Sequence, residues 1–267
     1  MLKTIFIINF IINIFYHQLQ AQESSILLNL NKLKHESNNQ LYNKLNHNNY
    51  TSIQITQNFP VNGAPKGRRR GGTSRDSCHD YKIPITALVP GETNQDTSFL
   101  SSTISQYPTF WVYVPELKDL SPTGEFILQD EGGNDVWRSL FPLQGKAGIV
   151  GINLPEKAEY ALQTGKKYHW YFRVYCNYKQ NKSDYVFVDA WLKKENSSLA
   201  LMLQLQKGRP QEYKIYMANK LWYESLTDLA KLRRNPSGNV IFTKEWAKLL
   251  TQLGLQELAI APIVQSF

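Results

Sequence analysis

Between Ile83 and Leu192, short runs of β-branched and aromatic residues alternate with clusters of Pro, Gly, Asn or Asp. Such runs are typical of strands, and the clusters between them are typical of turns. No segment of helical length separates the runs, which favours antiparallel pairing. The runs are PITALV, TFWVYV, EFILQ, DVWRSLF, AGIVGINL, KYHWYFRVYC and YVFVDAWL. The pattern therefore predicts an antiparallel immunoglobulin- or fibronectin-like β-sandwich of about seven strands.

The sixth run, KYHWYFRVYC at residues 167–176, separates into two sets of side chains. Successive side chains of a strand point to opposite faces of a sheet. We expect the more apolar set in the core: Tyr168, Trp170, Phe172, Val174 and Cys176. The alternate set is expected on the outer face, where it forms a candidate ligand face with Trp191 nearby: His169, Tyr171, Arg173 and Tyr175.

Leu162, Gly165 and Tyr168 fit the pattern L-x-x-G-x-x-Y at the start of this run. The pattern resembles the tyrosine corner of fibronectin type III and immunoglobulin-like domains, in which the phenol hydroxyl bonds upstream backbone and pins the strand. Cys176 lies eight residues past Tyr168 rather than two, so we do not expect the inter-sheet disulfide of antibody domains.

After Lys194 the apolar residues recur every three or four positions, which predicts helices in residues 195–267. Trp222 and Trp246 lie on the apolar stripes and are interpreted as packing residues. The fold class is therefore α+β, with the sandwich in residues 61–194 followed by helices that pack together or on the sandwich. Three helices are expected: one after a cap at Ser197 or Ser198 that ends at Gly208, one from Gln211 to Arg234, and one from a cap at Thr243 to Gly254.

The first 21 residues have the parts of a secretory signal peptide: Lys3, a mostly apolar run from Thr4 to Tyr16, and a polar tract that reaches Ala21. The run is short for a spanning helix, so we expect cleavage after Ala21, with a retained anchor as the alternative. Residues 22–60 are rich in Asn and predict a disordered spacer. We expect an exported protein, periplasmic or extracellular, without stable membrane insertion once the signal peptide is removed.

The net charge of +8 lies at the flanks of the predicted sandwich, since residues 79–195 carry a slight acidic excess. An exported protein has little access to nucleic acid, so we expect an anionic polysaccharide or a membrane surface as the electrostatic partner, and no nucleic acid. Arg68, Arg69 and Arg70 are a candidate anion-binding arm, and a merely solvated arm is the alternative. The glycines that follow lack the lysine of a phosphate-binding loop.

Cys78 and Cys176 are the only cysteines of the chain. In an oxidising compartment an even number of cysteines favours a disulfide, and two free buried thiols are the alternative. Apart from His79, no second Cys or His stands at ligand spacing beside either cysteine, so no metal site is expected.

The stretch QDEGGND brings Asp130, Glu131 and Asp135 close together in the sequence. A hairpin turn explains its two glycines and its Asn, while calcium ligation and catalysis by paired carboxylates are the alternatives. His169 has no serine or cysteine nucleophile that the sequence places beside it, so we interpret it as a sheet-surface histidine. We therefore expect no enzymatic activity and no cofactor.

Several segments together resemble the cyanobacterial family called domain of unknown function 928, in order from about Arg68 to about Pro262. The resemblance implies an exported cyanobacterial protein with both cysteines as family features, and it implies no reaction, cofactor or catalytic residue. A glycine is expected just before the Leu-Trp pair, where this chain has Asn219-Lys220-Leu221-Trp222. Asn also tolerates positive φ, so a break in the second helix there is an open alternative. The segments are RRRGGTSRDSC, ITALVP, PTFWVYVP, EFILQDEGGNDVWRSLFPL, GIVGINLP, GKKYHWYFRVYC, YVFVDAWLKK and LWYESLTDLAKLR.

The leading functional hypothesis is a non-catalytic extracytoplasmic binding or interaction module for an envelope polysaccharide or a protein. It follows from a sandwich without a nucleophile, metal cluster or phosphate loop. The ligand face would be lost if the C-terminal helices covered it. Two alternatives remain open: a hydrolase of envelope polysaccharide that uses Asp130, Glu131 or Asp135, and a scaffold or assembly factor that binds a protein through its C-terminal helices.

Overall fold

Most strands come first and the α-helices follow in the computed structural model of the chain, which confirms the α+β class. The prediction of helices for residues 195–267 is wrong at the end of the chain, where residues 263–266 form a strand that pairs with a strand of the earlier part. The predicted signal peptide (1–21), the spacer (22–60) and the disulfide between Cys78 and Cys176 fall outside the described residues and stay predictions. The structure describes residues 64–71, 81–92, 97–117, 122–175, 178–179, 181–234 and 239–267.

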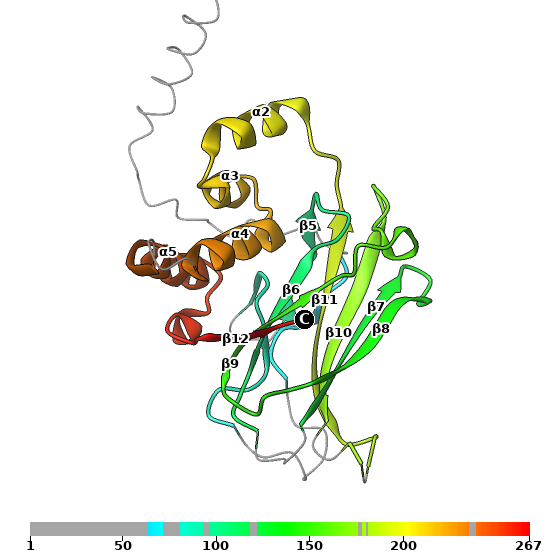
Figure 1. The fold of residues 1–267 in the computed structure, drawn as a ribbon. Coiled ribbons are helices and arrows are strands. Elements are labelled where there is room, and N and C mark those ends of the chain that lie inside the picture. The colour runs from blue at the N-terminus through cyan, green and yellow to red at the C-terminus, as the bar shows by residue number, and fades with distance from the viewer. Residues whose placement is uncertain are drawn as a thin grey trace, which may run out of the picture. The chain divides into compact units, whose positions relative to one another are not determined.

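The largest sheet has five strands in the order β5-β11-β10-β7-β8 (Figure 1). Its long strands pair antiparallel, as the alternating pattern predicts, and the short strand β5 pairs parallel to β11. The strands are β5 (Ser101–Thr103), β7 (Thr123–Asp130), β8 (Asp135–Pro142), β10 (Lys167–Tyr175) and β11 (Tyr185–Lys194).

A second sheet has the order β12-β9-β6-β2, and a third, small sheet has the order β1-β4-β3. In the second sheet β12 pairs parallel to β9, while β6 pairs antiparallel with β9 and β2. Its strands are β2 (Thr86–Ala87), β6 (Thr109–Val114), β9 (Gly148–Asn153) and β12 (Ile263–Ser266). The small sheet consists of two-residue strands: β1 (Gly67–Arg68), β3 (Gly91–Glu92) and β4 (Thr97–Ser98).

The main core lies between the five-stranded and the four-stranded sheet. Phe110 of β6 meets Phe126 of β7 with ring centroids 4.6 Å apart, and Phe126 stacks on Trp170 of β10 at 5.9 Å. The two sheets thus pack face to face around buried aromatic rings. An immunoglobulin-like sandwich of about seven strands is not confirmed, because the described residues contain twelve strands and two parallel pairings.

Strand β10 divides its side chains as predicted, with Tyr168, Trp170, Phe172 and Val174 in the core. The tyrosine corner is confirmed, because the backbone N–H of Gln163 donates to the Tyr168 hydroxyl oxygen at 2.8 Å. This bond fixes the turn before β10 to the first residues of the strand and so sets where β10 begins.

Helix α2 (Leu199–Gly208) begins as predicted, with the Ser198 hydroxyl oxygen accepting from the Leu201 N–H at 3.1 Å. The predicted second helix is divided into α3 (Glu212–Ala218) and α4 (Trp222–Arg234). The break lies at Lys220, whose φ of 59° is in the left-handed region that glycine favours.

Helix α5 (Asn239–Gln252) corrects the third prediction, because Thr243 lies inside the helix instead of capping it. The preceding Val240 and Ile241 are 72% and 65% exposed, so the buried apolar stripe does not extend to them and gave no signal of the earlier start. The helix ends before Gly254, as predicted, and the φ of Gly254 is 68°. None of the helices in the described ranges is long and apolar enough to cross a membrane.

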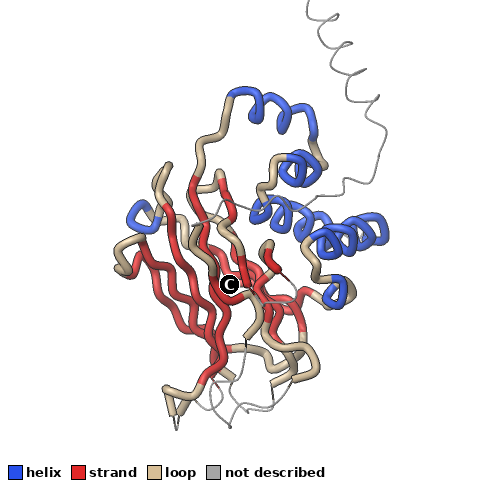
Figure 2. Tube along the Cα trace, turned by 180° about the vertical axis from the view of Figure 1, so that it is seen from behind, coloured by secondary structure: helices blue, strands red, loops and turns tan. Residues whose placement is uncertain are grey.

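The helices gather on one side of the strands, where α4 and α5 lie against the outer face of the four-stranded sheet (Figures 1 and 2). Trp111 on this face of β6 meets Trp246 of α5 edge-on, with centroids 6.3 Å apart. The Trp111 indole N–H also donates to the Thr227 hydroxyl of α4 at 3.1 Å. Strand β6 is therefore buried on both faces, which explains its unbroken apolar run TFWVYV.

The arginine-rich arm packs against the core unit instead of standing free in solvent. The Arg69 side chain is fully buried, and its guanidinium donates to the Gly91 carbonyl at 3.2 Å and to the Leu253 carbonyl at the end of α5. Arg70 pairs with Glu257 of the 3₁₀ helix η3 (Gln256–Leu258). The prediction of a solvated arm is wrong for Arg69, because its guanidinium lies between the small sheet and the end of α5.

The glycine at the start of this arm permits close packing. A Cβ atom on Gly67 would lie 2.5 Å from the Asp189 carbonyl oxygen of β11 and 2.7 Å from the Ser98 hydroxyl. Both distances are shorter than van der Waals contact, so a side chain at this position would push β1 away from β11.

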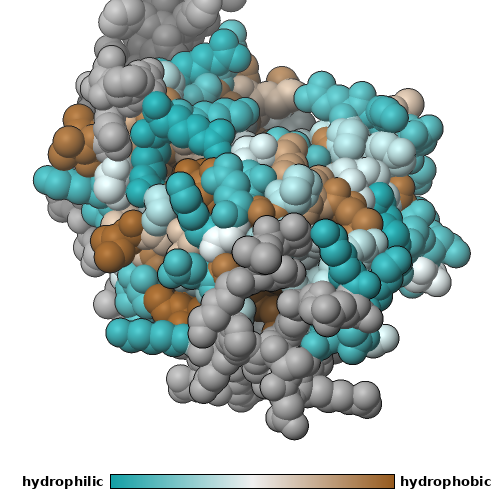
Figure 3. Space-filling model, turned by 60° about the horizontal axis from the view of Figure 1, so that its bottom comes forward, coloured by the Kyte–Doolittle hydropathy of each residue, from teal (hydrophilic) through white to brown (hydrophobic). Residues whose placement is uncertain are grey.

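The molecular surface shown in Figure 3 is a mosaic in which hydrophobic side chains of the described residues are scattered among hydrophilic ones. The exposed large apolar residues lie mainly on the helices, the largest fractions being Ile260 at 91%, Val240 at 72% and Leu199 at 69%. A single exposed apolar side chain such as Ile260 is ordinary for a protein surface.

We expect Arg69→Met to lower the free energy of unfolding by about 2–4 kcal/mol, because it leaves two buried carbonyl oxygens without their donors. Chemical denaturation of the purified protein measures this change. Arg209→Met is the matched control, since the Arg209 side chain is 77% exposed, and its effect should stay within about 0.5 kcal/mol. Equal effects of the two substitutions would contradict a structural role for Arg69.

Candidate functional site

The candidate site is the outer face of the five-stranded sheet, which lies away from the helices. The alternation of β10 places His169, Tyr171 and Arg173 there, as predicted, and each is partly exposed. Trp191 of β11 lies directly opposite His169 in the pairing register. The C-terminal helices cover the other sheet, so they leave this face uncovered (Figure 2).

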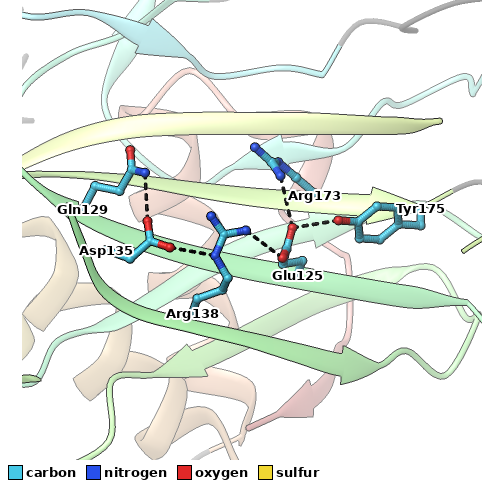
Figure 4. Close-up of polar contacts among 6 residues, drawn as sticks. All are labelled: Glu125, Gln129, Asp135, Arg138, Arg173 and Tyr175. Atoms are coloured by element: carbon cyan, nitrogen blue, oxygen red, sulfur yellow. Dashed lines mark hydrogen bonds and ion pairs between the residues drawn. The ribbon is translucent and has the colours of Figure 1, made fainter. Parts of the chain in front are cut away.

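A buried carboxylate, Glu125 of β7, organises one half of this face (Figure 4). Its side chain is 8% exposed and accepts from Arg138 Nη1 at 2.9 Å, from Arg173 Nη1 at 3.2 Å and from the Tyr175 hydroxyl at 2.7 Å. Glu125 and Arg173 are direct neighbours in the register of β7 and β10, and Arg138 reaches across from β8. A buried carboxylate needs several donors, and here the two strands that flank β7 supply them.

Tyr175, which the sequence placed in the ligand face, is buried and donates to Glu125 instead of facing solvent. Burial, and next the hydrogen bond to the Glu125 carboxylate, raise the pKa of Tyr175 to about 12. Its phenol therefore stays protonated at neutral pH and remains a donor. Arg173 also lies over the Tyr185 ring, with its guanidinium carbon 4.7 Å from the ring centroid.

Arg138 connects this cluster to Asp135 at the start of β8. Arg138 Nε donates to Asp135 Oδ2 at 2.8 Å, and Gln129 Nε2 donates to Asp135 Oδ1 at 2.9 Å. These hydrogen bonds, the one from Arg138 first, hold the pKa of Asp135 below its usual value. Figure 4 shows the resulting row of alternating acidic and basic groups across the sheet.

His169 organises the other half of the face. Its Nε2 lies 2.6 Å from Asp189 Oδ2, and its Nδ1 lies 2.7 Å from the Tyr171 hydroxyl. Burial and the nearby Asp189 carboxylate raise the pKa of Tyr171. A carboxylate oxygen accepts, so the imidazole carries a proton on Nε2 and donates it to Asp189. The imidazole also stacks on Trp191, with centroids 4.3 Å apart and an interplanar angle of 19°.

Asp189 joins this second cluster to the arm, because its Oδ1 accepts from the Arg68 N–H at 3.0 Å. The Arg68 guanidinium carbon lies 5.3 Å from the centroid of the ring of Phe187, which is on β11 like Asp189. Of the three arginines in the candidate anion-binding arm, Arg68 is thus exposed at the edge of the face, whereas Arg69 lies in the interior. Anion binding by the arm stays a prediction, and the buried Arg69 cannot contribute to it from the surface.

The acidic stretch QDEGGND is a hairpin turn between β7 and β8, as predicted. Asp130 Oδ1 accepts from the N–H groups of Gly132 and Asn134, both at 2.9 Å, and Gly133 has φ 81°. The Asn134 side chain and backbone are the main cause that lowers the pKa of Asp130. Glu131 contacts Lys167 at 3.6 Å. Among the residues with described positions, no group of three or more His, Cys, Asp or Glu could hold a metal ion.

The sequence did not single out Glu125, Arg138 or Asp189 as parts of the face. Glu125 opens the run EFILQ and Asp189 interrupts YVFVDAWL, so each is a charged residue on a strand that is otherwise apolar. That pattern marks an outward position, but the partner becomes known only with the pairing register of the sheet.

We expect Asp135→Asn to lower the stability of the protein at pH 7 and to have no effect in strong acid. The folded pKa of Asp135 is lowered, so its ion pair stabilises the fold above the unfolded pKa of about 3.9, and this stabilisation is lost as the pH falls through the folded pKa. Denaturation of wild type and variant between pH 7 and pH 2 measures the difference. A difference that stays constant over this range would contradict the ion pair.

Comparison with known protein families gives a match that spans the five-stranded sheet and the α-helices. A family profile described as Domain of Unknown Function (DUF928) matches residues 70–263, from the arm to the first residue of β12. No curated protein matches the chain. The matched range contains the outer face with both of its clusters and all four described α-helices. Because this range covers most of the sequence, the chain belongs to the DUF928 family.

Proposed function

We propose that the protein is a non-catalytic extracytoplasmic binding module that holds a glycan on the outer face of its five-stranded sheet. The observation that carries the proposal is the stack of Trp191, His169 and Tyr171 on a sheet face that the helices leave uncovered. The pattern of residues 1–21 supports the extracytoplasmic part.

The chemistry of the face suits a polyhydroxylated ligand. Sugar rings present apolar C–H faces that pack on aromatic rings, and their hydroxyls bond to carboxylate, amide and guanidinium groups. Trp191 and Tyr171 offer ring surfaces, while Arg173, Arg138 and Gln129 offer polar groups beside them. Their mutual hydrogen bonds hold these groups in place before a ligand arrives, which lowers the entropy cost of binding.

The same hydrogen bonds argue against turnover of a glycan at this face. Glycoside cleavage needs a carboxylic acid with a raised pKa opposite a second carboxylate. The pKa values of Asp130 and Asp135 are lowered instead, and Glu125 is already bonded to Arg138, Arg173 and Tyr175. The carboxylates of this face therefore suit binding better than proton transfer.

We expect Trp191→Ala to weaken glycan binding about tenfold or more, because it removes the largest ring surface of the face. Isothermal titration of the purified protein with neutral and anionic oligosaccharides of defined length measures the affinity. Phe242→Ala is the matched control, since Phe242 is a partly exposed aromatic residue on α5, outside the face. Loss of binding in Phe242→Ala but not in Trp191→Ala would overturn the proposal, and so would a lack of binding by the wild type.

A second candidate function is that of a scaffold that binds a protein through α2. Leu199, Met202 and Leu203 lie on one stripe of this helix and are 69%, 47% and 50% exposed. An apolar stripe that stays exposed is a feature of partner-binding helices.

A photo-crosslinking side chain at position 202 tests this second function in the producing cell. We expect one discrete cross-linked protein from position 202 and none from position 214, because Lys214 is an exposed polar residue of α3. Leu199→Ser should abolish the adduct without unfolding the protein, since Leu199 is already mostly exposed. Adducts of equal yield from both positions would contradict specific binding.

A further inference from the structure

A groove of about 790 Å³ lies on the helix-covered side of the protein, apart from the outer face of the five-stranded sheet. Helices α3 and α4 form one wall, and the connections after β5 and after β9 form the other. Its volume is in the range of pockets that hold small molecules or short peptide segments. The residues used below are Tyr107, Trp111, Tyr216, Glu224, Asp228 and Lys231.

The walls of the groove are fixed by the protein's own hydrogen bonds. Glu224 Oε1 in the first turn of α4 accepts from the N–H groups of Ile104 at 2.8 Å and of Ser105 at 3.1 Å. It also accepts from the Thr103 hydroxyl at 2.5 Å. These bonds connect the helix to the opposite wall, so the groove exists without a ligand.

Two carboxylates one helical turn apart, Glu224 and Asp228, line this groove, and their oxygens differ in the hydrogen bonds that they accept. Glu224 Oε1 holds the opposite wall, but Glu224 Oε2 is buried and has no hydrogen-bond partner among the described residues. Asp228 Oδ2 accepts from the Tyr213 N–H at 2.7 Å. Burial is the main cause that raises the pKa of Asp228 above its usual value. Glu224 Oε2 is closed to solvent and therefore to a ligand in the groove, so the partly exposed Asp228 carboxylate is the acceptor that a ligand can reach. Glu224 adds a second negative charge one helical turn away.

Aromatic rings surround these carboxylates. Tyr107, Trp111 and Tyr216 line the groove, and Trp111 is held by its hydrogen bond to Thr227. Burial, followed by the negative charges of Glu224 and Asp228, raises the pKa of Tyr216. A cation beside Tyr216 would therefore lie near negative charge and meet ring faces.

The basic residues of the groove do not reverse this preference. Lys231 and Arg234 line it but are exposed at its mouth, where water screens their charge. They favour a ligand whose cationic group enters first while the rest of the molecule stays near the opening.

We propose that this groove binds a primary ammonium group, carried by a free aliphatic amine or by a lysine side chain, at Asp228 and near the negative charge of Glu224. The ammonium has a positive charge, three donors and no acceptor, which suits a carboxylate with a second negative charge one helical turn away. A neutral hydroxyl of similar reach offers one donor and no charge, so it should bind far more weakly.

The test compares cadaverine and the blocked peptide acetyl-Gly-Lys-Gly-amide, whose only amine is the lysine side chain, with 1,5-pentanediol, which has the stem of cadaverine without its charges. The full protein is titrated by calorimetry, and the indole N–H signal of Trp111 is followed by NMR, because Trp111 lines the groove. We expect binding of one or both amines, with a shift of that signal, and at least about tenfold weaker binding of the diol. Binding of cadaverine alone assigns the site to free amines, and binding of the peptide alone assigns it to lysine side chains.

Asp228→Asn separates a ligand site from a structural one. The amide still accepts from the Tyr213 N–H and removes a carboxylate that burial disfavours, so the melting temperature should rise or stay unchanged. Amine affinity should nevertheless fall about tenfold or more. Glu224→Gln should also lower the amine affinity, and Glu245→Gln on α5, outside the groove, should leave the amine affinity unchanged. Equal binding of amine and diol, unchanged affinity in both groove variants, or no amine binding by the wild type would overturn the proposal.

Discussion

The buried guanidinium of Arg69 is the interaction on which the arrangement of the other elements depends. It joins the Gly91 carbonyl of the small sheet to the Leu253 carbonyl at the end of α5. The last carbonyl groups of a helix have no intrahelical partner and carry partial negative charge, so a cation is favoured there. Because Arg69 is fully buried, this contact can form only when the arm, the sheets and the helices are assembled together. The neighbouring Arg68 N–H donates to Asp189, so the same arm also positions a carboxylate of the outer face.

The fold could be predicted where one local pattern decides it. The period of two in β10, the L-x-x-G-x-x-Y corner and the Ser198 cap each depend on a few adjacent residues, and all three are confirmed. The short strands could not be predicted, because two residues such as those of β1 show no alternation. The role of Arg69 was equally hidden, since its acceptors lie 22 and 184 residues away in the sequence and a run of arginines suggests solvent.

The candidate face was predictable in part for the same reason. Alternation along β10 gave His169, Tyr171 and Arg173, but their partners come from other strands, with Glu125 separated from Arg173 by 48 residues. Tyr175 shows the limit of the method, because a period of two assigns a face and not a degree of burial. The groove left no local signal, since helix α4 and two distant connections contribute its walls. Only the spacing of Glu224 and Asp228, four residues apart on α4, was visible in the sequence.

The two surfaces differ in how many donors their carboxylates already have. On the outer face, Glu125 accepts from three side chains, and Asp135 accepts from Arg138 and Gln129, which lowers its pKa. In the groove, Glu224 Oε2 has no partner among the described residues, and burial raises the pKa of Asp228. Hydrogen bonds that favour the charged form lower a carboxyl pKa, and desolvation raises it, so the two directions report strong hydrogen bonding at Asp135 and partial burial at Asp228. A carboxylate with several side-chain donors holds a surface in shape, whereas a partly buried carboxylate that accepts from one backbone N–H gains more from a cationic ligand.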